Sequence, residues 1–145
     1  MHAHEFFRLV SDKRKHYGYL TQLMRKASSK MDSASGRPSQ RAGHEPTGST
    51  EFQEAVQESR RIEEKRTEAL GYRDAAEVIL DRLPSVEQAQ LLRLRYLGGA
   101  TMKEAASQTG YTLRWAYYAQ RSAFAWLDEH GIVDDVLAEL EMSGE

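Results

Sequence analysis

Basic and aromatic side chains gather in one short stretch after Thr112 and could together contact a nucleic acid. They are Arg114, Trp115, Tyr117, Tyr118 and Arg121. No Asp or Glu lies between Glu104 and Asp128. A guanidinium can donate two parallel hydrogen bonds to the edge of a guanine or to a phosphate. These residue types therefore indicate recognition of bases and phosphates rather than catalysis.

The candidate binding set comprises nine residues that share this chemistry or cap the helices that carry it. They are Thr101, Lys103, Thr112, Leu113, Arg114, Trp115, Tyr117, Tyr118 and Arg121. The two arginines and Tyr118 are expected at bases or phosphates, and Leu113 and Trp115 at thymine methyl groups or sugars. Lys103 and the backbone amides at the two threonines are expected at phosphates. Taken singly, Trp115 and Tyr117 are equally compatible with core packing.

Local signals predict the helices that position these residues. Gly98-Gly99 is expected to end one helix, and Thr101 to cap the next in a capping box with Glu104. Gly110 is expected as a left-handed C-terminal cap, and Thr112 as the N-cap of a helix that runs through Leu127. The residues expected on the buried faces of these two helices are Met102, Ala105, Ala106, Ala116, Ala119, Ala123 and Leu127.

Over Leu83–Leu127 the sequence resembles region four of bacterial sigma factors and, more closely, small phage transcriptional regulators of the RinA and ArpU type. The matching residues are Leu91, Leu92, Arg95, Tyr96, Thr101, Glu104, Gly110, Tyr111, Thr112, Arg114, Tyr117, Ala123, Phe124 and Leu127. The resemblance implies a helix-turn-helix whose second helix enters the major groove of DNA. It also implies a phage or prophage activator of late or packaging genes that contacts RNA polymerase. Leu113 and Trp115 stand where that family often has basic or polar residues, so its base preferences do not transfer.

The predicted fold is all-α, with a long helical hairpin or coiled coil followed by the helix-turn-helix domain. Residues 1–83 are expected to form an oligomerisation region with a flexible linker at about 32–50, residues 84–130 the DNA-binding domain, and residues 131–145 an acidic amphipathic tail. The tail has apolar residues at helical spacing, so it either packs on the domain or binds a partner protein. The seven acids of residues 128–145 could also cover the basic helix.

Two long helices are expected in the first half, over His4–Lys30 and from Glu51 to about Arg82. The first has a seam with alternating four- and three-residue steps, as in a coiled coil: Phe6, Val10, Lys13, Tyr17, Leu20, Met24, Ala27 and Met31. The second has its own stripe, which includes Phe52. The helices could fold back as an antiparallel hairpin or pair between chains, and a homodimer is expected. The linker is expected to be a solvated tether, although Arg37, Arg41 and His44 could touch phosphates.

Charge is distributed unevenly along the chain, although the net charge is only −2. Residues 1–50 carry nine Lys or Arg against four Asp or Glu, and residues 51–83 carry six against nine. Residues 84–127 carry five against two, whereas residues 128–145 carry seven acids and no Lys or Arg. The sign of the charge in one segment indicates its binding partners better than the net charge of the whole chain does. The basic stretch coincides with the candidate binding set.

Several classes of protein do not fit the sequence. Cysteine is absent, the mean hydropathy is −0.68, and no apolar stretch approaches the ~18 residues of a membrane span. The start lacks the pattern of a secretion signal. Motifs for phosphate loops, serine hydrolases and zinc proteases are absent. We therefore expect no enzyme, no cofactor and no metal, and a location in the cytoplasm of a bacterial host.

Three functions remain open at this point. The first is a sequence-specific regulator that binds double-stranded DNA. The second is a recognition subunit for DNA packaging similar to a small terminase, which would form rings instead of dimers. The third is a protein-interaction module whose aromatic face binds another protein, which would show no affinity for duplex DNA at low salt.

Overall fold

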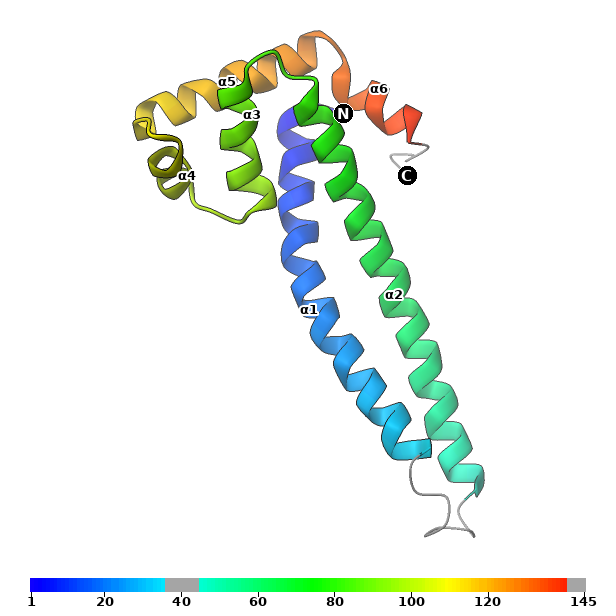
Figure 1. The fold of residues 1–145 in the computed structure, drawn as a ribbon. Coiled ribbons are helices and arrows are strands. Elements are labelled where there is room, and N and C mark those ends of the chain that lie inside the picture. The colour runs from blue at the N-terminus through cyan, green and yellow to red at the C-terminus, as the bar shows by residue number, and fades with distance from the viewer. Residues whose placement is uncertain (36–44, 141–145) are drawn as a thin grey trace. The chain divides into compact units, whose positions relative to one another are not determined.

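A computed structural model describes residues 1–35 and 45–140, and within those ranges the chain is helical with no strand (Figure 1). The elements are α1 (Ala3–Ser35), α2 (Glu45–Asp81), α3 (Val86–Leu92), the π-helical turn η2 (Arg93–Leu97), α4 (Met102–Thr109), α5 (Leu113–Glu129) and α6 (Ile132–Glu139). The predicted all-α class is confirmed. The chain forms two compact units, Met1–Arg14 with Gly71–Glu145 (unit 1) and Lys15–Leu70 (unit 2).

Unit 1 has an aromatic core to which both ends of the chain contribute. Phe7 of α1 is fully buried and stacks on Phe124 of α5, with ring centroids 5.4 Å apart. Its ring also lies 5.4 Å from that of Tyr96 and 5.3 Å from that of Phe6. Ile79 of α2 is buried in the same cluster. Aromatic rings bury large apolar areas, so this cluster is expected to dominate the stability of unit 1.

Helix α6 belongs to this core. Val133, Val136 and Leu137 are buried in it, so of the two alternatives for the tail, packing on the domain is the one observed for α6. Leu140 is 43% exposed, so the expected apolar stripe ends before it. An ion pair of 2.5 Å between Arg82 and Glu139 fixes the acidic side of α6 to the end of α2. Residues 141–145 of the predicted tail lie outside the described residues.

In unit 2, α1 and α2 pair antiparallel within one chain, as in the hairpin alternative (Figure 1). The buried cluster consists of Leu20, Ala27 and Ile62, with Leu23 and Met24 packed against it. Ser59 donates a hydrogen bond to the sulfur of Met24 (3.2 Å), and Arg66 donates one to the hydroxyl of Tyr17 (3.3 Å). Phe52 is 39% exposed, so its predicted place in the buried stripe is wrong.

Both long helices extend further toward the predicted linker than expected. Helix α1 continues through Ser35 rather than ending near Lys30, and α2 begins at Glu45 rather than Glu51. Pro46 is compatible with this start, because the N–H groups of a first helical turn have no intrahelical acceptor. Residues 36–44 of the predicted linker, with Arg37, Arg41 and His44, lie outside the described residues.

Candidate nucleic-acid interface

The turn before α4 is formed by the two glycines that the sequence singled out. The N–H of Gly98 donates to the carbonyl of Arg93 (2.8 Å), which closes the π-helical turn, and the N–H of Ala100 donates to Leu94 (2.9 Å). Gly99 has a φ of +78°, a backbone conformation that residues with a Cβ rarely adopt. The predicted end of this helix at Gly98-Gly99 is confirmed, and the turn leads directly into α4.

The predicted caps of α4 and α5 are all present. Thr101 and Glu104 form a reciprocal capping box with two hydrogen bonds of 3.1 Å. The backbone N–H of Thr101 lowers the pKa of the Glu104 carboxyl by hydrogen bonding to its charged form. Gly110 ends α4 with a φ of +82°, and the Thr112 hydroxyl caps α5 by accepting the N–H of Trp115 at 3.1 Å.

Helices α4 and α5 cross on small side chains. Their buried contact residues are Met102, Ala105, Ala106, Ala116 and Ala119, which pack with Leu91 of α3. Alanine lets two backbones approach closely, and close-packed interiors tolerate little rotation of either helix. This packing fixes which face of α5 is covered, and the predicted buried faces of both helices are confirmed.

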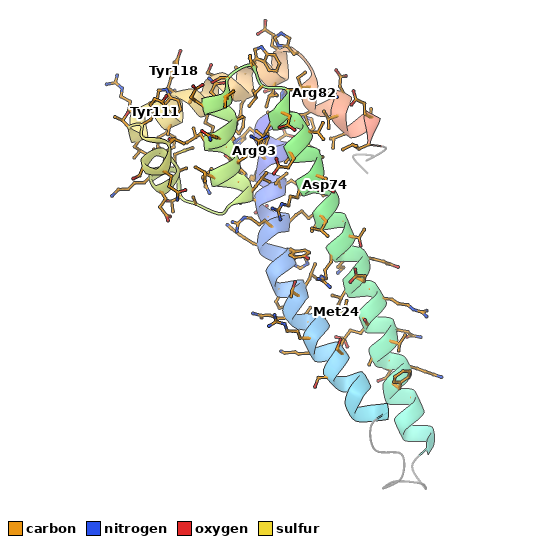
Figure 2. All side chains as sticks on the ribbon, in the orientation of Figure 1. Met24, Asp74, Arg82, Arg93, Tyr111 and Tyr118 are labelled. Carbon is orange, nitrogen blue, oxygen red and sulfur yellow. The ribbon has the colours of Figure 1, made fainter. Side chains whose placement is uncertain are left out.

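The opposite face of α5 carries the predicted basic and aromatic residues. Arg114, Tyr117, Tyr118 and Arg121 are exposed at spacings of three and four residues, so they share one side of the helix. Tyr117 is 50% and Tyr118 64% exposed, so the core alternative for Tyr117 is wrong. Figure 2 labels Tyr118 on this part of the molecule. The other candidates Thr101, Lys103, Thr112 and Leu113 are also exposed.

The cations in this part of the chain divide into paired and unpaired groups. Arg93 is held by Glu77 (2.9 Å) and Asp81, which raise the pKa of its guanidinium. In contrast, Lys103, Arg114 and Arg121 form no ion pair or hydrogen bond with any residue that the structure describes. Their charges are therefore available to an external anion.

Trp115 is not exposed like the other predicted binding residues of α5. Its side chain is half-buried and packs against the cluster of small residues between α4 and α5. The Tyr111 ring stacks on it, with centroids 3.9 Å apart and an interplanar angle of 20°. Tyr111 is 44% exposed and was not among the predicted site residues. No local spacing rule indicates this stack, because Tyr111 precedes the N-cap Thr112 and therefore does not share the helix with Trp115.

Comparisons with protein-family models, curated proteins and solved structures found no match. No group of three His, Asp or Glu side chains within residues 1–35 and 45–140 could hold a metal ion. None of the helices described there combines the length and the apolar composition that a bilayer span requires.

Proposed function

We propose that this chain is a sequence-specific, double-stranded DNA-binding transcription regulator of phage or prophage origin. In this proposal α4 and α5 form a helix-turn-helix, and the first turns of α5 enter the major groove. The observation that carries the proposal is the outward face of α5, where Arg114, Tyr118 and Arg121 are exposed, unshielded by acids and aligned on one side. Such a face combines base-reading donors with phosphate-binding cations.

Each side chain has a proposed contact. Arg114, on the first turn of α5, reads a base edge, and Leu113 contacts a thymine methyl group. Tyr117, Tyr118 and Arg121 lie further along the same groove. Lys103, on the helix that crosses the DNA backbone, contacts a phosphate. Trp115 offers less of its ring to the DNA than its sequence position indicates, because much of the ring packs against the protein and Tyr111 covers one face.

The wider proposal includes a homodimer, activation of late or packaging genes, contact with RNA polymerase and residence in the bacterial cytoplasm. The dimer is best tested by light scattering on the full chain, because removing residues 1–50 would also remove Phe6 and Phe7 from the core of unit 1. A dimer supports the regulator, whereas a larger ring would favour a packaging subunit similar to a small terminase.

The central test is selection of bound duplexes from a random pool, followed by binding to the selected site and its single-base variants. Arg114→Ala is expected to relax preference at one base pair, with a loss of about 1–3 kcal/mol of discrimination. Lys103→Ala is expected to weaken all duplexes alike. Failure of the wild-type chain to bind any duplex at low salt would overturn the proposal and favour a protein-interaction module.

A further inference from the structure

A guanidinium from the first helix lies against the turn that precedes α4. A Cβ built on Gly99 would stand only 2.6 Å from Nη1 of Arg14 and 3.0 Å from its Cζ, so the guanidinium packs directly on the Gly99 backbone. Arg14 and Gly99 both belong to unit 1. Gly98 and Gly99 are exposed, so this contact lies at the protein surface. Helix α1 thus supplies a cation beside the N-terminus of α4.

This guanidinium has no partner within the part of the chain that the structure describes. Its Nε is buried without a hydrogen bond, and no carboxylate forms an ion pair with it. The side chain as a whole is half-buried. A partly desolvated charge without a counter-charge is unfavourable, so binding of an anion there would offset that penalty. An arginine that only filled space against Gly99 could be replaced by an uncharged side chain of similar length.

The groups around the turn are mainly positive. Arg95 donates from Nη1 to the carbonyl of Ala100 (3.3 Å), and Lys103 is exposed on the first turn of α4. Glu104 is the acid of that turn, and its carboxylate is already engaged by the N–H of Thr101. The dipole of α4 adds partial positive charge at the same end. The electrostatic environment of Arg14 therefore favours an anion.

We propose that Arg14 contacts a backbone phosphate of the bound duplex and extends the interface from α4 and α5 to helix α1. This inference rests on the proposed function, because the phosphate belongs to the same DNA that α5 reads. A backbone contact adds affinity without sequence information. Arg14 should therefore affect the salt dependence of binding and leave base preference unchanged.

The test compares two neutral variants of the full chain, Arg14→Met and Arg14→Gln, with a matched control, Arg8→Met. Arg8 is exposed on the same helix but about 120° around its axis from Arg14. Binding to one mixed-sequence duplex is measured between about 50 and 200 mM salt. Each neutral Arg14 variant should reduce the magnitude of the slope of log Kobs against log salt by about 0.9, which is about threefold less affinity lost across that range. Arg8→Met should match the wild type, and Arg14→Lys should retain the wild-type slope.

Each alternative gives a different result. If the wild type binds duplex and both neutral variants keep its slope, Arg14 is no phosphate contact, even when their thermal midpoints fall. If inorganic phosphate at constant ionic strength raises the thermal midpoint of the wild type but not of Arg14→Met, and the slopes agree, the site binds free phosphate instead. If the wild type binds no duplex, the proposed function itself fails, which is a separate outcome.

Discussion

Helices α1 and α2 contribute to both compact units, but the two units are stabilised by different kinds of contact. In unit 1, Phe6 and Phe7 of α1 meet Ile79 and Leu80 of α2 in an aromatic core that α3, α5 and α6 complete. Among the side chains of unit 2 that the structure describes, the buried cluster consists of Leu20, Ala27 and Ile62. Among the described side chains, the same helix pair therefore packs with phenylalanine rings in unit 1 and with aliphatic side chains in the cluster of unit 2.

The candidate interface on α4 and α5 belongs to unit 1, the unit with the aromatic core. Unit 2 supplements its cluster with polar contacts, such as those of Arg66 with Tyr17 and of Ser59 with Met24. A hydrogen bond typically adds only about 1 kcal/mol net, much less than a buried phenylalanine ring. We therefore expect unit 2 to open locally at lower free energy than unit 1, which hydrogen exchange can measure.

The largest expected effect comes from Phe7, whose ring contacts Phe6, Tyr96 and Phe124. Phe7→Ala should lower the free energy of unfolding by about 3–5 kcal/mol, because it removes a fully buried ring from the core of unit 1. Leu20→Ala in unit 2 should lower it toward the low end of ~2–5 kcal/mol. Denaturant unfolding gives both values, and equal losses would contradict the comparison between the units.

Local structure around the interface was predictable, whereas the partners of the first helix were not. The capping residues Thr101, Gly110 and Thr112 act on N–H and C=O groups within a few positions, so a short stretch of sequence is enough to identify them. The stacking of Phe7 on Phe124 depends on tertiary packing. Periodicity shows that Phe7 belongs to a helix but does not show which ring it meets.

Dependence on tertiary packing also explains why some site residues differ from expectation. Trp115 could face the groove or the core, and only the packing of α4 on α5 decides in favour of partial burial. Arg14 had no local signal at all, because its position beside Gly99 depends on how α1 packs in unit 1. The sequence did not predict the start of α2 at Glu45, because proline and glycine disfavour the interior of a helix, although a first turn accommodates the proline at position 46.

A smaller effect tests whether α6 is part of unit 1. Leu137→Ala should lower the free energy of unfolding by about 2–3 kcal/mol, near the lower end of values for buried leucines. Leu140→Ala, at the 43%-exposed end of the same segment, should change it by less than about 0.5 kcal/mol. Similar small changes for both variants would mean that α6 contributes little to the core, and the acidic segment would then be better described as a separate tail.

The smallest expected effect is a pH dependence at the capping box of α4. Hydrogen bonding from the Thr101 N–H holds the pKa of the Glu104 carboxyl below its ordinary value, so the folded state favours the charged form. Its contribution to stability should be present above the ordinary glutamate pKa of about 4.3 and should be lost as pH falls through the lower folded value. Glu104→Gln keeps an acceptor for Thr101 but removes the titrating charge. The stability difference between wild type and Glu104→Gln should therefore shrink as the solution is acidified.

Glu129→Gln is the matched control, because Glu129 is exposed and forms no hydrogen bond or ion pair with the residues that the structure describes. A wild-type advantage over Glu104→Gln that stays constant from neutral to acid pH would show that the charge of Glu104 does not stabilise the start of α4.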